Sequence, residues 1–469
     1  MTRIETDYLV IGAGAVGLAF ADTLLTETEA HITIVDRHGK PGGHWNDAYS
    51  FVALHQPSAF YGVNSLPLGS GRKDSIGVNA GMYELASGPE VSGYFDTVMR
   101  QQLLPSGRVR YLPMSDYHGD GRVVSLLSGE ETHVSVKRKT VDATYYGTTV
   151  PATHTPKFAV CDGVRLVTPN ALPQLWMSRD PHPTRYVIVG AGKTAMDVGV
   201  WLLASGAVPE SIVWVMPRDS WLLDRARIQP GPEFFDATIG AQAAQMEAFA
   251  TATTIDDLFE KLEAVGLMVR IDPAVKPTMM HYATISRGEI AQLQRIETVI
   301  RRGHVHAIEA DALVFGDGRV AVDRGALYID CTASAVEKRP AVPIFQGERI
   351  TPQLVRAPQP AFSAALVAFV EAHFADDHQK NELCATVPFP DGLETFPATN
   401  IVNMMNQFRW SQNKMLRKWI LGSRLDGFGK VVAAVERDDA AKQAILGKFQ
   451  EHGLAAIANL QRLAAASTG

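Results

Sequence analysis

Hydrophobic runs in the first fifty residues alternate with one helical pattern. Residues 8–11 (Tyr-Leu-Val-Ile) form a short apolar run typical of a buried strand, and residues 31–35 (His-Ile-Thr-Ile-Val) form a second. Between them a glycine-rich turn precedes residues 19–25, which predict a helix. The order strand, helix, strand predicts a βαβ unit with parallel strands.

The same order returns in the middle of the chain. Residues 186–189 (Tyr-Val-Ile-Val) predict a strand, and a glycine-rich turn follows. A helical pattern then extends to about residue 204, and residues 211–215 predict the next strand. The chain is therefore expected to contain two similar α/β units.

The segments outside these units have other patterns. Short alternating runs in residues 109–146 predict an antiparallel meander, and residues 225–300 are mostly helical in pattern and are interpreted as an insertion. Residues 312–322, around Asp317-Gly318, predict a β-hairpin that leads into a strand at residues 326–329. From about residue 429 the chain is Ala-rich and helical in pattern, and no low-complexity linker separates the segments, so we expect interleaved domains.

The first glycine-rich turn, residues 12–17, reads Gly-Ala-Gly-Ala-Val-Gly, a GxGxxG pattern placed between a strand and a helix. In a dinucleotide-binding turn Gly12 allows the tight turn, Gly14 admits a pyrophosphate, and Gly17 lets helix and strand pack closely. Asp36 follows Gly17 by 19 residues, near the spacing of about 20 expected for a ribose-binding carboxylate. The alternative is a glycine-rich turn that binds no nucleotide, which this combination disfavours.

The second glycine-rich turn, residues 190–195, reads Gly-Ala-Gly-Lys-Thr-Ala, a GxGxxA pattern in the same place of the second unit. The strand that follows ends in Val-Met-Pro-Arg at residues 215–218, without an acid. Arg218 would attract a 2′-phosphate and bind it in bidentate fashion, which favours NADPH over NADH. The alternative is an ordinary surface arginine. Two dinucleotide sites in one chain indicate a flavoprotein that receives electrons from a nicotinamide.

With these motifs the sequence resembles the two-dinucleotide flavoproteins of glutathione-reductase type. Among them it is similar to the group B flavoprotein monooxygenases, meaning flavin-containing monooxygenases, Baeyer-Villiger enzymes and amine N-hydroxylases. The resemblance spans about residues 5–340 and leaves the C-terminal quarter unassigned. Besides Gly12, Gly14, Gly17 and Asp36, it is carried by Gly42-Gly43-His44-Trp45, by Val-Gly-Ala-Gly-Lys-Thr-Ala-Met-Asp at 189–197, by Asp142-Ala143-Thr144 with Pro151 downstream, and by Asp330-Cys331-Thr332-Ala333.

The resemblance implies that the first motif binds FAD, the second binds NADPH, and the two Asp-x-Thr segments are crossovers between the domains. The implied FAD-binding residues are Gly12, Gly14, Ala15, Gly17, Asp36, Arg37, Gly43, His44 and Trp45. The implied NADPH-binding residues are Gly190, Gly192, Lys193, Thr194, Ala195 and Arg218. Tyr145 and Ala333 replace the glycine that usually follows the threonine, and residues 158–169 lack the histidine of the family's usual linker motif FxGxxxHxxxW.

Residues 54–65 occupy the region in which related monooxygenases place a polar group over the flavin. Such a group donates a hydrogen bond to the flavin hydroperoxide and keeps peroxide from leaving early. The predicted catalytic residues are His55, Gln56 and Asn64. The alternative for each is a loop side chain satisfied by the backbone.

Three other groups of residues invite a functional interpretation. Residues 371–378 contain two His and three acids, but they extend a helical pattern without HExxH and are interpreted as a solvated helix face. His304 and His306 are expected to alternate across a strand, so we predict no metal site. Phe408-Arg409-Trp410 with Asn403, Asn406 and Asn413 could line a substrate pocket or form a packed interdomain seam.

Composition narrows the class of protein. The 469 residues carry 44 Lys+Arg and 50 Asp+Glu, a net charge of −6, and no basic block that would follow a phosphate backbone, so we expect no nucleic-acid partner. Three well-separated cysteines form no CxxC pair and fit a reduced, cytoplasmic location. No apolar window is long enough to span a membrane, and we predict neither a targeting segment nor a membrane partner.

Together these observations predict an α/β fold with two Rossmann-like domains, one for FAD and one for NADPH, the second inserted into the first. The expected boundaries are 1–155 for the first part of the FAD domain, 156–335 for the NAD(P)H domain with its helical insertion at about 225–300, and 336–469 for the remainder. The predicted function is an FAD-dependent, NAD(P)H-utilising monooxygenase that oxygenates a small organic substrate with O₂ through a flavin hydroperoxide. The alternatives are a flavin reductase or oxidase without oxygen insertion, and a redox sensor without turnover. Oligomeric state stays open, with the Ala-rich C-terminal helices as a candidate interface.

Overall fold

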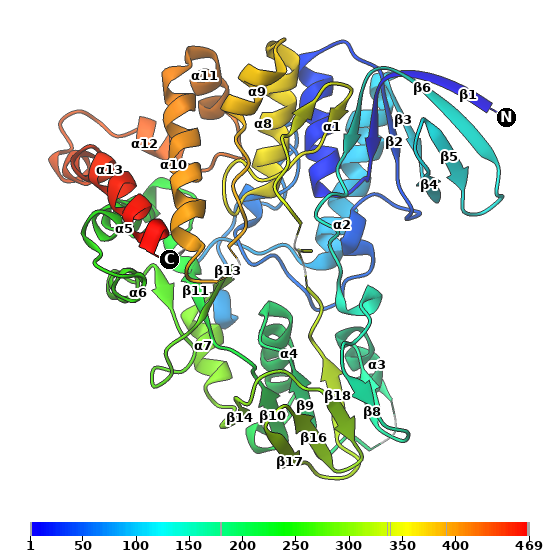
Figure 1. Ribbon diagram of the computed structural model, residues 1–469, viewed down its shortest axis with the longest axis vertical. Helices are drawn as coiled ribbons and strands as arrows, with labels where there is room; N and C mark the ends of the chain where they lie inside the picture. The colour runs from blue at the N-terminus through cyan, green and yellow to red at the C-terminus, as the bar shows by residue number, and fades with distance from the viewer. Residues whose placement is uncertain (1, 179–180, 335, 338, 391, 467–469) are drawn as a thin grey trace.

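The computed structural model describes residues 2–178, 181–334, 336–337, 339–390 and 392–466. Figure 1 shows one sheet with α1 and α8 in the upper part, a second sheet with α4 in the lower part, and helices α5, α6, α10 and α13 on one side. The helices are α1 (Ala15–Glu27), α2 (Gly88–Thr97), α3 (Leu172–Met177), α4 (Lys193–Ala204), α5 (Ala241–Thr251), α6 (Ile255–Ala264), α7 (Arg287–Leu293), α8 (Pro360–His373), α9 (Asp377–Leu383), α10 (Phe396–Gln412), α11 (Lys414–Gly422), α12 (Gly429–Ala433) and α13 (Ala440–Ala466).

The first sheet has the strand order β19-β20-β6-β1-β2-β3, and β4 and β5 extend it through β6. Its long path is parallel apart from the β19-β20 pair, and Tyr8 to Ile11 of β1 pair with Ile32 to Val35 of β2. The strands are β1 (Thr2–Ile11), β2 (Ile32–Val35), β3 (Val109–Leu112), β4 (Ser115–Tyr117), β5 (Arg122–Ser125), β6 (Glu131–Asp142), β19 (Phe345–Gln346) and β20 (Arg349–Ile350).

The second sheet has the order β14-β10-β9-β18-β8 and is parallel throughout. Its strands are β8 (Arg165–Val167), β9 (Tyr186–Val189), β10 (Ile212–Val215), β14 (Thr298–Ile300) and β18 (Leu327–Asp330). The chain leaves the first sheet after β6 and returns to it at β19, so the second sheet is inserted into the first. The predicted α/β class with two Rossmann-like units is confirmed.

The two sheets repeat one topology. The order β6-β1-β2-β3 in the first sheet matches β18-β9-β10-β14 in the second. The turns after the matching strands are also alike, because Asp142 accepts hydrogen bonds from the backbone and hydroxyl of Thr144 (3.1 and 2.7 Å), and Asp330 accepts the same pair from Thr332 (2.9 and 2.6 Å). These turns are the points at which the chain crosses between the sheets.

A third part of the molecule surrounds a small separate sheet. Its strands are β12 (Met268–Val269), β11 (Ser220–Asp224) and β13 (Met279–Ile285), in that order. Trp221 of β11 packs in one buried cluster with Phe259, with Phe396 of α10 and with Leu460 of α13. The expectation of a mostly helical insertion at 225–300 is therefore wrong in part, because this segment contributes two strands to that sheet and β14 to the second sheet.

Two further strand predictions need correction. Only β4, β5 and β6 are antiparallel in residues 109–146, since β3 pairs parallel to β2. His304 and His306 lie in the loop before β15 (Ala307–Glu309) and therefore do not alternate across a strand. The predicted hairpin is confirmed as β16 (Ala312–Phe315) and β17 (Gly318–Ala321), in a sheet completed by β15 and β7 (Ala159–Val160).

The acidic and histidine residues at 371–378 do not form one solvated helix face. Helix α8 ends at His373 and α9 begins at Asp377, and Glu371 is buried. Its carboxylate accepts hydrogen bonds from the Tyr8 hydroxyl (3.0 Å) and from Lys380 (2.6 Å). Burial and the neighbouring Glu371 carboxylate raise the pKa of Tyr8. Glu371 therefore ties α8 to β1 and α9, and within the described residues no cluster of three or more metal-ligating side chains forms.

Within the ranges that the structure describes, no helix is both long and apolar enough to cross a bilayer.

Candidate functional site

Gly12 and Gly17 of the first glycine-rich turn, and Gly43 next to it, have no room for a side chain. A Cβ atom built on Gly17 would lie 1.9 Å from the carbonyl oxygen of Gly12. Gly12 itself has φ of +98°, which favours glycine, and Gly43 (φ +57°) would place a Cβ 2.9 Å from the Cα of Gly14. Two glycine backbones, from the turn and from the 3₁₀ segment η1 (Gly43–Asn46), therefore approach each other closely above the start of α1.

Helix α1 begins directly at this turn, with Gly14 as its N-cap. No side chain caps the helix, and no acid occupies its first turn. The first backbone N–H groups of a helix have no partner within the helix and carry partial positive charge, so an anion fits there. The turn thus offers a pyrophosphate both space and hydrogen-bond donors.

A cavity of about 940 Å³ extends from this turn along the carboxyl edge of the first sheet. Its volume is within the range of small-molecule and cofactor sites. Seven predicted FAD-binding residues line it, namely Gly12, Gly14, Ala15, Asp36, Arg37, Gly43 and His44. The turn, the uncapped helix and the cavity together fit an FAD molecule.

Asp36, at the end of β2, is buried and already hydrogen-bonded. One carboxylate oxygen accepts from the backbone N–H of Ala13 (2.5 Å), and the other accepts from the backbone N–H of His38 (2.7 Å) and faces its ring (2.9 Å). His38 also contacts Asp47 (2.8 Å), and these carboxylates raise the pKa of His38 to about 9. A carboxylate has about four acceptor positions, so Asp36 retains one for a ribose hydroxyl.

His44 and Trp45 follow the close approach of the two glycine backbones. Burial lowers the pKa of His44 to about 4, so its ring is neutral at pH 7. The indole N–H of Trp45 donates to the Tyr61 hydroxyl (2.8 Å), and Tyr61 lines the cavity. The GGHW segment therefore fixes one wall of the cavity to the loop that holds the predicted catalytic residues.

That loop is held from the C-terminal part of the chain. Arg424 donates hydrogen bonds to the backbone carbonyls of Ala59 (2.9 Å), Tyr61 (2.6 Å) and Val63 (2.8 Å). The side-chain oxygen of Asn64 accepts from the hydroxyl of Ser423 (2.8 Å). Asn64 thus contacts the C-terminal segment, and none of the three predicted catalytic side chains lines the cavity.

The second glycine-rich turn repeats the first with one difference. Gly190 has φ of +132°, and a Cβ there would lie 2.5 Å from the carbonyl oxygen of Cys331 in the crossover. Gly192, the N-cap of α4, faces open space, and no side chain caps that helix. The difference lies at Lys193, whose side chain is only 9% exposed because its ammonium group pairs with carboxylates of α4 and α7.

Lys193 belongs to a cluster of buried charges. Its ammonium group pairs with Asp197 one turn along α4 and with Glu289 of α7 (2.9 Å). Arg225, which is 1% exposed, pairs with Glu289 (2.7 Å). Burial raises the pKa of Glu289, but Lys193 and Arg225 outweigh it and bring the pKa to about 2. Two cations and two anions therefore balance in this cluster, which we call the seam because Tyr49 and His55 of the first unit contact it.

His55 faces this cluster. Its Nε2 atom lies 3.5 Å from a carboxylate oxygen of Asp197, the same oxygen that accepts from the Tyr49 hydroxyl (2.7 Å). Arg225 donates to the backbone carbonyl of His55 (2.8 Å). Of the predicted catalytic residues, His55 alone thus contacts the second dinucleotide unit.

Arg218 follows β10 and is exposed. On the side of β10 away from β9 lies the parallel strand β14, and Arg301 after β14 pairs with Asp219 (2.9 Å) and Asp272 (3.2 Å). Among the described residues Arg218 has no recorded ion pair, so its guanidinium is available for a 2′-phosphate.

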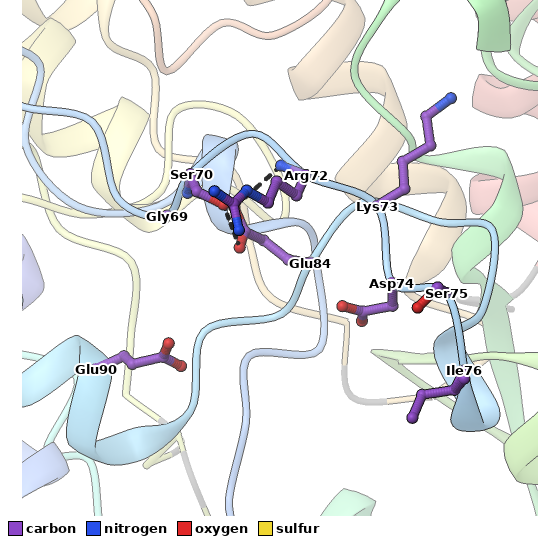
Figure 2. Close-up of a pocket in the computed structure, with 9 residues that line it drawn as sticks. All are labelled: Gly69, Ser70, Arg72, Lys73, Asp74, Ser75, Ile76, Glu84 and Glu90. Carbon is purple, nitrogen blue, oxygen red and sulfur yellow. Dashed lines mark hydrogen bonds between the residues drawn. The ribbon is translucent and has the colours of Figure 1, made fainter.

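A second hollow, of about 580 Å³, lies beside residues 69–76 (Figure 2). Figure 2 shows the Glu84 carboxylate directed at Ser70 and Arg72. It accepts hydrogen bonds from the backbone N–H groups of Ser70, Gly71 (2.7 Å) and Arg72 (3.4 Å). Successive N–H groups of this kind can bind anions, but here the protein's own carboxylate uses them.

A family model described as an NAD(P)-binding Rossmann-like domain matches residues 10–66. The uncharacterized protein Rv2000 of Mycobacterium tuberculosis is 47% identical over 448 residues, which cover 96% of this chain and 82% of that protein. The chain belongs to the same family. The uncharacterized protein Mb2023 of Mycobacterium bovis is also 47% identical over 448 residues, with the same coverage of both chains. The family therefore has members in both mycobacteria.

One solved structure shares the fold at low sequence identity, and two others align with lower TM-scores. Cyclohexanone monooxygenase bound to ε-caprolactone in the Loose conformation covers 88% of this chain and 99% of its own, with a TM-score of 0.51 and 13% identity. A flavin-containing monooxygenase from Stenotrophomonas maltophilia aligns over 81% of this chain and 100% of its own, with 15% identity and a TM-score of 0.46. A bacillithiol disulfide reductase from Staphylococcus aureus aligns over 79% and 98%, with 10% identity and a TM-score of 0.46.

Sequence reasoning missed several residues of the seam. The pairing of Lys193 with Asp197 has a local signal, because residues four apart lie on the same face of a helix. Tyr49, Arg225 and Glu289 have no such signal, since their partners lie far away in the sequence. The role of the C-terminal Arg424 in holding the loop is likewise visible only in the structure.

Proposed function

We propose that the protein is an FAD-dependent, NADPH-utilising monooxygenase that oxygenates a small organic substrate. The observation that carries this proposal is the repeated topology, in which two uncapped helix N-termini follow two glycine turns at matching positions of two joined sheets. One such site binds one dinucleotide, so a pair supports an electron donor and an electron acceptor in one chain. The fold shared with cyclohexanone monooxygenase is compatible with this function.

The residues of the chain bind and orient the two groups. Gly12 and Gly17 let the turn and the start of α1 pack closely, Gly14 admits the pyrophosphate of FAD, and Asp36 accepts a hydrogen bond from a ribose hydroxyl. Gly190 lets the second turn pass close to Cys331, and Gly192 leaves space for NADPH. Bound FAD supplies hydride acceptance and reaction with O₂, while the protein positions it and excludes water from the seam.

Disulfide reduction fits the chain less well than oxygenation. Cys161 is exposed, whereas Cys331 and Cys384 are buried, and all three are free thiols. Burial and the adjacent Asp330 raise the pKa of Cys331, so its thiol stays protonated at neutral pH. Since a relay to a disulfide needs a reactive thiolate and a nearby second cysteine, the chain lacks that relay.

A flavin oxidase is the second candidate, and one observation favours it. None of His55, Gln56 and Asn64 lines the cavity, so none of these side chains is placed to protect bound FAD while it would react with O₂. An enzyme without such protection releases hydrogen peroxide.

A two-stage mixing experiment on the FAD-loaded protein separates these functions. The protein is reduced anaerobically with NADPH, then mixed with O₂, while the flavin absorption spectrum and peroxide are followed. A lasting near-ultraviolet band before reoxidation is the result expected for a monooxygenase. Immediate return of oxidised flavin with one peroxide per NADPH, unchanged across a screen of amines, sulfides and ketones, identifies an oxidase. Bound FAD that NADPH does not reduce would contradict both functions.

Replacing Arg218 with alanine should weaken NADPH selectively. A charged hydrogen-bond pair contributes about 1.5–3 kcal/mol, so the KM for NADPH should rise by about 10- to 100-fold. The KM for NADH should change by less than about 2-fold, because NADH carries no 2′-phosphate. Steady-state flavin reduction with each nucleotide measures both constants. The exposed Arg295, replaced in the same way, is the matched control, and equal effects on NADPH and NADH would disprove the phosphate role.

A further inference from the structure

The seam between the two dinucleotide units holds His55 at two points. Arg225 fixes its backbone by donating to the carbonyl oxygen (2.8 Å), and Asp197 faces its ring nitrogen Nε2 (3.5 Å). Arg225 is itself held by Glu289 (2.7 Å) and by Asn79 (3.2 Å). His55 therefore occupies a defined position opposite the N-terminal turn of α4, although it comes from a loop of the other unit.

The two ring nitrogens of His55 have different surroundings. Nε2 is shielded from solvent and has no hydrogen-bond partner within the described residues, and a carboxylate oxygen of Asp197 lies 3.5 Å from it. Nδ1 has no recorded partner among those residues and is not among the buried unpaired atoms, while 37% of the side chain is exposed. Nδ1 is thus the nitrogen that an incoming molecule can reach.

We propose that Asp197 is a positioning residue that holds His55 in the Nε2–H tautomer, so that Nδ1 meets the bound substrate as a proton acceptor. A carboxylate accepts but does not donate, so it favours the tautomer whose proton points toward it. The 3.5 Å separation is longer than a formed hydrogen bond, and contacts of this kind commonly shorten when a ligand binds.

The charge balance of the seam supports a neutral ring. The groups facing His55 are Asp197 and Lys193 on α4, Arg225, and Tyr49, and Glu289 stands behind Lys193 and Arg225. These two cations and two anions already cancel, so a protonated His55 would add an uncompensated charge. Burial and Lys193 lower the pKa of His55, against the opposing effect of Asp197.

The proton transfer that follows is simple. A substrate N–H or O–H group hydrogen-bonds to Nδ1 and passes its proton there, which leaves the substrate atom with its electron pair. The imidazolium then has both nitrogens protonated, its charge is balanced by the negative charge left on the substrate, and Asp197 orients it from the Nε2 side, as in other Asp–His pairs. This assigns the substrate a hydrogen-bond donor group beside the atom to be oxidised, and it reverses the expected role of His55 as a donor to the flavin hydroperoxide. The inference rests on the proposed function for the reaction that the transfer serves.

The test is nitrogen-15 NMR of the holoenzyme labelled only in its histidines, without substrate or NADPH. The signals that disappear in His55→Gln belong to His55. The expected result at pH 7 is a neutral ring protonated at Nε2, and in Asp197→Asn a shift of at least about 3-fold in the tautomer ratio toward Nδ1–H. Asp377→Asn, which alters a carboxylate paired with Lys139 and Lys380 on the other unit, should leave the ratio unchanged.

Each other outcome overturns part of the inference. A wild-type ring protonated at Nδ1, or charged at pH 7, disproves the proton-acceptor role. A ratio unchanged in Asp197→Asn disproves the role of Asp197. If Asp197→Asn does not fold, Tyr49→Phe replaces it: removing the hydroxyl frees an acceptor position on Asp197, so the Nε2–H population should stay or rise, and a fall overturns the inference. Because this spectrum needs no turnover, its result is independent of whether the protein is a monooxygenase or an oxidase.

Discussion

Replacing Gly17 with alanine should yield protein that retains less than about a tenth of its FAD. The new Cβ would lie 1.9 Å from the carbonyl oxygen of Gly12 and 3.3 Å from the Cβ of Ala143, so the turn and the start of α1 must separate. Because both obstacles belong to the backbone or to a short side chain, no rotamer change relieves them. Overpacking of this kind costs about 1–3 kcal/mol, and the phosphate-binding backbone moves with it.

The flavin-to-protein absorbance ratio after purification, and a titration of the apoprotein with FAD, measure this loss. The matched control is Gly447→Ala in α13, where a Cβ meets no atom within 4 Å. Alanine in a helix interior stabilises by about 0.5–1 kcal/mol relative to glycine, so this variant should keep its FAD and unfold at a slightly higher urea concentration. Full FAD retention in Gly17→Ala would show that the first glycine turn does not hold the cofactor.

Gly17 also shows why so much of the fold could be predicted from the sequence. A GxGxxG turn between an apolar strand run and a helix uses residues that are adjacent in the chain, and the same turn at Gly190 predicted the second unit. Helix α1 begins at Ala15 rather than at residue 19, because the glycine turn itself supplies its N-cap. Local signals therefore predicted the two units, whereas the insertion of one into the other was implied by the resemblance.

The third part of the molecule could not be predicted in this way. Strand β11 pairs with β13, about sixty residues later, and their cluster is completed by Phe396 and Leu460 from the C-terminal part. The short strands of residues 268–285 have no long alternating pattern, so helical periodicity dominated the interpretation of that segment. Glu371 was wrongly predicted to lie on a solvated helix face for a related reason, since its partner Tyr8 lies 363 positions away in the sequence.

The residues of the candidate site also differ in how well the sequence predicted them. Residues that act through the backbone, such as Gly12 and Gly192, were identified by motif alone. The direction of a side chain depends on distant charges, and for this reason Lys193 was expected beside a phosphate whereas the structure pairs it with Asp197 and Glu289. The predicted roles of the site residues stay predictions until the variants above are measured.

Lys193→Met should lower the free energy of unfolding by about 3–5 kcal/mol. Methionine keeps the length and helix propensity of lysine but leaves Asp197 and Glu289 buried with one cation fewer, and a broken buried ion pair costs that amount. Lys261→Met is the matched control, because Lys261 also pairs with an aspartate four residues away on a helix but is 36% exposed. Exposed pairs contribute about 0.3–0.5 kcal/mol.

The pH dependence of unfolding distinguishes this mechanism from a simple packing defect. Lys193 holds the pKa of Asp197 below its usual range and helps to lower that of Glu289 to about 2, against the opposing effect of burial on both. Groups with a lowered folded pKa stabilise the protein above their unfolded pKa of about 4 and lose that contribution as the pH falls toward 2. In urea unfolding, the free energy of unfolding of the wild type should therefore fall between about pH 5 and pH 2. It should fall less over the same range in Lys193→Met. Parallel curves for the two proteins would mean that the ammonium group does not stabilise these carboxylates, and the lower stability of Lys193→Met would then be a packing defect.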